Sequence, residues 1–395
     1  MRIAGLDRGL THWGMVSAAL TTPSGRALAA ACLLWALAAG CGGAQQTTPE
    51  HGGAAAAQPK PEPPPAVPDD ALQILPAGID GVARADLTTL RKSPHYPRIE
   101  GWARRYGCLG NDVDHWLLQR TELLVMTSYP PSGAGGAGAS PSTQPGSDRE
   151  FLALARGRFR PQDGPAALAL AADWSGQPAA PAGEEQRIRG FAVWQSGPTA
   201  VAVLGERWLL AGSRARVEQT LAGLGITGFQ AVTGDPWLAE RGGPAELQKS
   251  DLVVHHLPDR ESLAQLRRQL GAVGAGSVGR ALVEAPIAVH GSVGDDVRAQ
   301  AVGRTGSAEQ AAAARKRLST LLRQASFVLK LTGAPGFLDR ARIEATPEAE
   351  LRLGLDLQPG EVPSVARRLE AVLNASTRRC PEPDAQPAQL TSTQQ

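Results

Sequence analysis

The sequence has little lysine, few aromatic residues and almost no net charge. Five of its 40 basic residues are lysines, aromatic residues make up 4%, and the formal charge of the 395-residue chain is +2. A charge this small excludes a strongly basic nucleic-acid-binding protein and a highly acidic solvating chain. Hydrophobic residues nevertheless reach 42%, which is enough for a packed core and excludes disorder throughout.

Sequence motifs for phosphate binding, metal binding and covalent catalysis are also missing. The chain has no Gly-Lys dipeptide, no H-E-x-x-H, no C-x-x-C and no G-x-S-x-G, so the common signatures of these sites are excluded. Residues 274–279 match G-x-G-x-x-G. A predicted helix precedes this match and a predicted strand follows it, which is the reverse of the order in a dinucleotide site. We therefore predict no catalytic residues and no cofactor.

Histidine is the remaining candidate for site chemistry. His255 and His256 are adjacent on a predicted strand, so their rings point to opposite faces and do not readily share a metal. His290 lies on another predicted strand and could neighbour one of them. We interpret such a pair as structural and predict no metal site.

No apolar run is long enough to cross a membrane. Residues 27–39 form the longest candidate, thirteen residues after Arg26, whereas a transmembrane helix needs about 20. This length is typical of the apolar part of a signal peptide. Met15 would give a signal of ordinary length, so translation could start there.

The sequence Leu37-Ala38-Ala39-Gly40-Cys41 follows this run and resembles the lipobox of bacterial lipoproteins, in which small residues precede a cysteine. The resemblance implies cleavage after Gly40 and a diacylglyceryl thioether on Cys41, with two or three acyl chains on the mature protein, which is enough for stable membrane anchoring. Ala38 departs from the pattern, because leucine is commoner there. An ordinary secretory signal ending near a cysteine is the alternative.

The resemblance also bears on the destination. Gly42 and Gly43 follow Cys41, and the aspartate that retains some lipoproteins at the inner membrane is missing, so we expect an outer-membrane location facing the periplasm or the surface. Removal of residues 1–40 would leave 37 basic and 37 acidic residues. The neutral mature chain thus has no basic field for nucleic acid or anionic lipid.

The exported part divides into a tether, a body and a tail. Residues 41–70 are rich in proline and lack large apolar groups, which predicts a disordered, extended tether; a proline-rich ligand for a recognition domain is the alternative. We divide the body into halves at 71–240 and 241–380, and expect residues 381–395 to be disordered.

Alternating polar and apolar residues predict an α+β fold with antiparallel sheets and helices packed on one face. The predicted strands are 121–129, 150–159, 187–195, 200–211, 251–256, 283–293, 297–304, 341–346 and 350–357. Gly212-Ser213 and Gly306-Ser307 each lead from strands into a predicted helix, with Ser213 and Ser307 as N-caps. This recurrence suggests an internal duplication of a strand-helix-strands-helix unit; chance similarity is the alternative.

Two residue pairs are the remaining site candidates. Cys108 and Cys380 are the cysteines left after signal removal and lipidation, and an oxidising compartment favours a disulfide between them; two free thiols are the alternative. Trp194 and Trp208 lie in the tryptophan-rich first half and could line a ligand pocket.

These observations favour a membrane-anchored, non-enzymatic envelope lipoprotein that acts as a binding or scaffold module. Its expected partners are a membrane, reached through the lipid, and an envelope protein, with no nucleic acid. The second hypothesis is a carrier or sensor of an apolar ligand in the periplasm, and the third is an enzyme.

Overall fold

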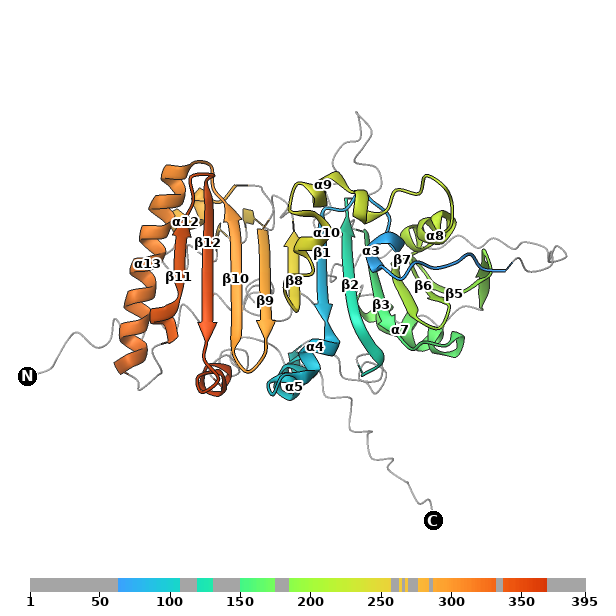
Figure 1. The fold of residues 1–395 in the computed structure, drawn as a ribbon, viewed down its shortest axis with the longest axis horizontal. Helices are drawn as coiled ribbons and strands as arrows, with labels where there is room; N and C mark the ends of the chain where they lie inside the picture. The colour runs from blue at the N-terminus through green and yellow to red at the C-terminus, as the bar shows by residue number, and fades with distance from the viewer. Residues whose placement is uncertain are drawn as a thin grey trace, which may run out of the picture.

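Twelve antiparallel strands form one continuous sheet in the computed structural model, which describes residues 63–106, 119–130, 150–174, 185–256, 263–264, 267–268, 276–283, 287–331 and 337–367 (Figure 1). The predicted α+β class with antiparallel pairing is confirmed. Cys41, Cys108, Cys380, the proposed signal and most of the proposed tether lie outside the described residues.

The strands follow one another across the sheet in the order β11-β12-β10-β9-β8-β1-β2-β3-β7-β6-β5-β4. Their bounds are β1 Gly81–Asp86, β2 Thr121–Tyr129, β3 Glu150–Gly157, β4 Gln186–Ile188, β5 Phe191–Ser196, β6 Thr199–Leu204, β7 Trp208–Ser213, β8 Leu252–His256, β9 Ile287–Val293, β10 Val297–Arg304, β11 Arg342–Ala345 and β12 Glu350–Leu357.

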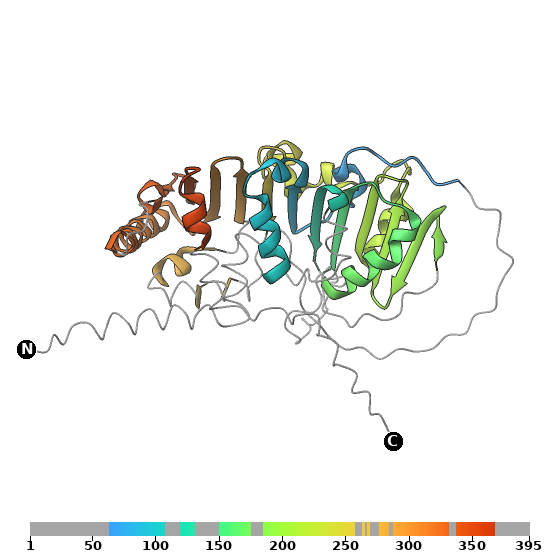
Figure 2. The same ribbon diagram turned by 90° about the horizontal axis from the view of Figure 1, so that it is seen from below.

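The helices are distributed unequally along the sheet. The described α-helices are α3 Ala71–Ile74, α4 Leu87–Lys92, α5 Tyr96–Tyr106, α7 Gly164–Trp174, α8 Arg214–Gly223, α9 Pro236–Ala239, α10 Gly243–Glu246, α12 Gly276–Ala281 and α13 Ala308–Leu331. Figure 2 shows the sheet along its edge, with α7 and α12 on one side and α9 and α10 on the other. The prediction of helices on one face is therefore wrong for the first half of the sheet.

The order of elements recurs in the two halves. β1 and β8 lie side by side at the centre of the sheet. In the first half the hairpin of β2 and β3 is followed by α7 and then by strands β4 to β7, the last of which pairs with β3. In the second half the hairpin of β9 and β10 is followed by α13 and then by β11 and β12, the last of which pairs with β10. The Gly-Ser pairs do not mark this recurrence, because Gly212-Ser213 precedes α8 after the last strand of its half, whereas Gly306-Ser307 precedes α13 after the hairpin. The two serines also differ in use: Ser307 caps α13, whereas the hydroxyl of Ser213 makes no capping hydrogen bond to α8.

Two predicted strands each divide into two. Residues 187–195 become β4 and β5, and residues 200–211 become β6 and β7. The first break falls at Arg189 and Gly190, whose φ angles of 49° and 81° produce a tight hairpin of the type that matches the strand twist. The second break includes Gly205 at φ 64°. Both turns are short and an apolar strand follows each at once, so each pair of strands was predicted as one.

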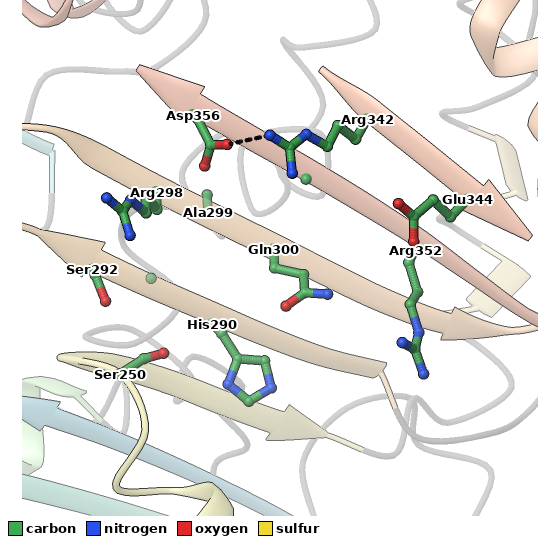
Figure 3. Close-up of a pocket in the computed structure, with 12 residues that line it drawn as sticks. Ser250, His290, Ser292, Arg298, Ala299, Gln300, Arg342, Glu344, Arg352 and Asp356 are labelled. Atoms are coloured by element: carbon green, nitrogen blue, oxygen red, sulfur yellow. Dashed lines mark ion pairs between the residues drawn. The ribbon is translucent and has the colours of Figure 1, made fainter. Parts of the chain in front are cut away.

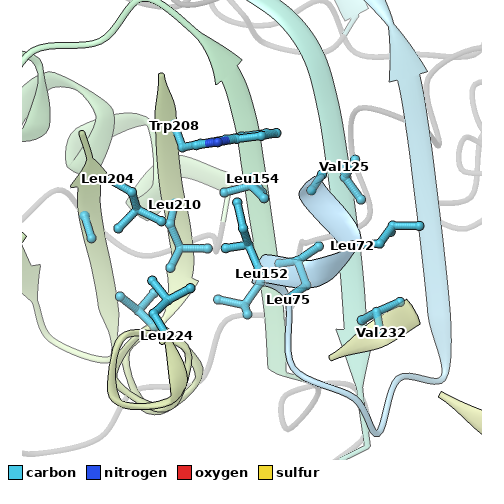
Figure 4. Close-up of a cluster of buried hydrophobic side chains, with 14 of the residues drawn as sticks. Leu72, Leu75, Val125, Leu152, Leu154, Leu204, Trp208, Leu210, Leu224 and Val232 are labelled. Atoms are coloured by element: carbon cyan, nitrogen blue, oxygen red, sulfur yellow. The ribbon is translucent and has the colours of Figure 1, made fainter. Parts of the chain in front are cut away.

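Buried side chains cover both faces of the first half. On one face Leu152, Leu154, Leu210 and Trp208 pack with residues of α3 and α8 (Figure 4). On the opposite face a second cluster forms between the sheet and the apolar residues of α7. In the second half the described clusters place α12 and α13 against the face that carries Leu351 and Leu353, continuous with the α7 side.

We predict that Leu210→Ala lowers the free energy of unfolding by about 2–5 kcal/mol, because Leu210 is fully buried and its truncation leaves a cavity. Ile226→Ala is the control: Ile226 is 54% exposed, and its replacement is expected to change stability by about 0.5 kcal/mol or less. Urea unfolding of both variants measures the difference. Equal losses in the two variants would contradict this assignment of the core.

Candidate functional site

An uncovered polar surface lies on the second half of the sheet, on the face that α3, α8 and α10 cover in the first half. No described helix lies over β9, β10 and β12 on this side (Figure 1). The alternation of side chains along these strands places polar groups here and apolar groups on the α13 side. We call this surface the polar face and define it by His290, Ser292, Arg298, Gln300, Arg342, Glu344, Arg352 and Asp356.

A hollow of about 320 Å³ lies within the polar face (Figure 3). The strand register explains it: Gln300 pairs with His290 on one side and with Gly354 on the other, and Gly354 pairs with Arg342. Gly354 places no side chain in the middle of this row. A Cβ built there would lie 3.8 Å from Arg342, so a larger residue fits without a clash and would fill the hollow.

The charges of the polar face are balanced and paired locally. Arg298 donates to Asp296, and Arg352 donates to Glu350. A guanidinium nitrogen of Arg342 lies 3.5 Å from a carboxylate oxygen of Asp356. These ion pairs are exposed and contribute little to stability.

The side chains of Gln300 and Glu344 have no hydrogen-bond partner within the part of the chain that the structure describes, and both residues are exposed. Neither tryptophan, tyrosine nor phenylalanine is present among the residues that line the hollow. The surface therefore offers hydrogen bonds and charges of both signs rather than an apolar or stacking contact.

A histidine pair lies where the covered and uncovered parts of this face meet. The ring centroids of His255 and His290 are 5.3 Å apart in an edge-to-face arrangement, so the predicted proximity of His290 to one of the two adjacent histidines is confirmed for His255. His255 is 3% exposed, and neither of its ring nitrogens has a hydrogen-bond partner among the residues that the structure describes. A buried, unpaired imidazole is expected to be neutral.

The surroundings of the pair oppose protonation. Burial is the main cause that lowers the pKa of His255 to about 4; the positive charges of His290 and Arg241 add to it, while Glu246 opposes it. Burial likewise lowers the pKa of His290, with Lys249 adding to the effect and Glu246 again opposing it. The Glu246 carboxylate is itself engaged by Lys249, which lowers its pKa.

The other predicted site residues do not converge on this surface. Trp194 is buried against α7, whereas Trp208 is buried in the cluster on the opposite face of the sheet. No single pocket is therefore lined by both. Among the described residues no group of three histidine, cysteine or acidic side chains is placed to hold a metal ion. Within the same residues, no helix has the length and apolar character needed to traverse a bilayer.

Sequence reasoning missed most of the polar face. It singled out His290 but not Arg298, Gln300, Gly354 or Asp356. The alternation in residues 297–304 and 350–357 already indicated one polar side. What the alternation does not indicate is that the same side is covered in one half and open in the other.

Comparisons with known proteins add a distant structural similarity. No protein-family model and no curated protein matches the sequence. The solved structures that match include TP0453 in crystal form III, with a TM-score of 0.44 and 11% identity over 75% of this chain and 98% of that chain. Crystal form I of TP0453 has a TM-score of 0.42 and 10% identity over 78% of this chain and 98% of that chain. Similarity of this size does not establish a shared function.

We predict that the stability of the protein falls on acidification because of His255. The unfolded chain protonates this residue near pH 6.5, whereas the folded protein keeps it neutral to about pH 4. The contribution of His255 to the free energy of unfolding is therefore complete above pH 6.5, and it falls by up to about 3 kcal/mol as the pH drops to 4.

Urea unfolding between pH 7.5 and 4 tests this dependence in the parent, in His255→Leu and in His95→Gln. His95 is half-buried and its Nε2 lies 3.0 Å from the carbonyl oxygen of Asp295, a contact that a glutamine side chain can also make, so its replacement is expected to leave the slope unchanged. The leucine variant is expected to flatten the slope. A parental slope retained in His255→Leu would assign the acid sensitivity to other groups.

Proposed function

We propose that this protein is a lipid-anchored, non-enzymatic binding module of the bacterial envelope, and that the polar face is the surface it offers to an envelope protein. The single observation that carries the proposal is the contrast between the halves. Topologically equivalent strands bury leucines and valines on this face in the first half but expose charged and amide side chains in the second. An antiparallel sheet can leave one face open to solvent, and the open face is then available to another macromolecule.

The charge balance of the polar face indicates the kind of partner. The polar face contains three arginines and the acidic residues Glu344 and Asp356, and Asp296 and Glu350 next to it pair with two of the arginines. A polyanion or a polycation would therefore meet both repulsion and attraction. A protein surface or extended peptide with charges of both signs fits better. The hollow at Gly354 would receive one of its side chains.

The location of the protein in this proposal depends on Cys41. The lipobox-like sequence supports a thioether at Cys41, and the glycines after it favour the outer membrane, facing the periplasm or the surface. A tether of the length of residues 41–70 would let the body move over a membrane-proximal region while it stays attached.

We predict that the mature protein begins at a lipidated Cys41 and sediments with membranes, and that Cys41→Ser releases it from them. Mass spectrometry of the N-terminal peptide and fractionation of the envelope measure the two effects. Gly43→Ser is the control, because it changes a neighbouring residue and keeps the thiol. An unmodified mature N-terminus, or membrane association of Cys41→Ser equal to that of the parent, would refute the anchor.

We also predict that a photo-crosslinking amino acid in place of Gln300 gives a discrete adduct in intact cells. The same amino acid in place of Glu309, which is exposed on α13, is expected to give none. Gly354→Val fills the hollow and is expected to reduce the Gln300 adduct at least fivefold.

Gly291→Val is the matched control, since Gly291 lies on β9, pairs with Ala299 and points to the opposite side of the sheet, with its nearest contacts at 3.7 Å or more. The adduct is expected to persist in this variant. Identical adducts from positions 300 and 309, or no adduct from position 300, would contradict the proposed binding surface.

A further inference from the structure

A separate hollow, of about 860 Å³, lies at one end of the first half of the sheet. Thr121 at the start of β2 pairs with Gly157 at the end of β3, and Trp208 at the start of β7 pairs with Arg156. The turns and segments that flank these strand ends therefore meet around the hollow. Its volume lies within the range of small-molecule sites, and it shares no lining residue with the polar face.

Arginine is the main component of this hollow, which we call the arginine hollow and define by Arg91, Arg120, Arg158, Arg160 and Arg207. Glu122 and Glu206 are the acidic residues in its lining. Asp163 and Asp69 lie next to it and pair with two of the arginines. Positive charges still outnumber negative ones when all four carboxylates are counted, and the nearly neutral charge of the whole chain does not reveal this local excess.

Two of the five arginines have uncommitted side chains. Arg158 and Arg160 are exposed, and their guanidinium groups form no hydrogen bond or ion pair within the part of the chain that the structure describes. Phe159 between them is buried in the cluster on the α7 side. Because side chains alternate along an extended backbone, burial of Phe159 turns both arginines the other way.

The backbone that carries these two arginines is held on both sides. Phe159 donates its N–H to the carbonyl of Glu206 at 3.0 Å, and Gly157 donates to the carbonyl of Arg207 at 2.8 Å. The carboxylate of Asp163 accepts from the backbone N–H of Arg160 at 2.7 Å. A ligand that binds here would therefore need to order side chains but not the main chain, which lowers the entropic cost of binding.

A glycine brings a third arginine close to this segment. A Cβ on Gly157 would lie 2.2 Å from the backbone oxygen of Arg120, so the absence of a side chain at Gly157 allows the two segments to approach. Arg120 reaches Asp163 through one nitrogen, at 3.3 Å, and its side chain is 42% exposed.

The acidic residues leave the positive charge of the hollow available. Glu122 lies 3.5 Å from Arg156, which is outside the lining, and the side chain of Glu206 forms no ion pair among the described residues. The pair of Arg207 with Asp69 is exposed, at 58% and 81% for the two side chains. Exposed pairs of this kind contribute little to stability, so an incoming anion can compete for Arg207.

We infer that the arginine hollow binds a small molecule that carries two or more phosphate groups, with Arg158 and Arg160 as its main contacts. Guanidinium groups donate paired hydrogen bonds to oxyanions. A phosphate has oxygens that point in several directions and can bridge arginines from separate segments, whereas a planar carboxylate presents two. One phosphate would occupy only part of a hollow of this volume. The site does not depend on the function proposed for the polar face.

Isothermal titration calorimetry at physiological ionic strength tests the inference on the chain from residue 41 onward carrying Cys41→Ser, which avoids detergent. Tripolyphosphate is the main probe, inorganic phosphate has a single group, and citrate has several carboxylates. We expect saturable 1:1 binding of tripolyphosphate, about tenfold tighter than that of either other anion. No saturable binding of tripolyphosphate, or equal affinity for citrate or inorganic phosphate, would overturn the inference.

A flotation assay distinguishes a soluble ligand from a phosphate head group in a membrane. Vesicles of phosphatidylcholine with and without phosphatidic acid are mixed with the same chain. We expect no binding to either kind that survives an excess of tripolyphosphate. Binding to phosphatidic acid by a chain that does not bind tripolyphosphate would overturn the small-molecule assignment.

Variants locate the site. The double variant Arg158→Gln, Arg160→Gln is expected to weaken tripolyphosphate binding at least about tenfold, and it should fold because neither side chain has a partner to lose. Arg298→Gln with Arg342→Gln on the polar face removes the same charge and is the matched control, expected to keep the parental affinity. An equal loss in the two double variants, or no loss in the first, would contradict the location.

A variant of opposite sign completes the test. Glu206→Gln removes a carboxylate from the lining of the hollow and is expected to strengthen tripolyphosphate binding about twofold. Glu344→Gln removes an equally exposed carboxylate from the polar face and is expected to have no effect. Weaker binding in Glu206→Gln, or the same gain in both variants, would show that the ligand does not lie in the arginine hollow.

Discussion

The antiparallel pairing of β1 with β8 is the interaction on which the rest of the structure depends. Five residue pairs, from Gly81 with His256 to Ala85 with Leu252, join the two halves into one sheet. The pairing carries Val253 of the second half into the core cluster of the first, where it is fully buried. At one end Gly81 lies between β2 and β8, and a Cβ there would lie 2.5 Å from the hydroxyl of Ser128 on β2 and 3.2 Å from Nδ1 of His256 on β8.

One continuous sheet makes the two faces common to both halves, and the helices then decide what each face does. The segment between α8 and β8 contributes α9 and α10 to one face only, so that face is buried in the first half and open in the second. His255 and His290 lie at this transition, close enough to Glu246 to feel its charge. The imidazole of His255, at the edge of the covered region, is buried without a hydrogen bond, and such burial is unfavourable for the folded state.

The segment that connects the two halves lies beside two hollows of this face. Leu247 and Gln248 line the hollow over β1 to β3, and Ser250 lines the hollow of the polar face. Glu246 and Lys249, next to them in the chain, act electrostatically on the histidine pair between the two hollows. This segment therefore borders the covered and the open part of the same face.

The sequence by itself determined the local elements with strong periodicity and the class of fold. Residues 121–129, 297–304 and 350–357 form strands with the predicted bounds, and Ser307 caps α13 by accepting from the N–H of Gln310. Such features depend on neighbours in the chain. Only the tertiary structure decided the use of Ser213, whose hydroxyl accepts from Phe151 of β3 instead of capping α8. The strand register that opens a hollow at Gly354 also depends on residues distant in sequence, as does the covering of one face in the first half alone. The alternation along a strand cannot specify which of its two faces meets a helix and which meets solvent.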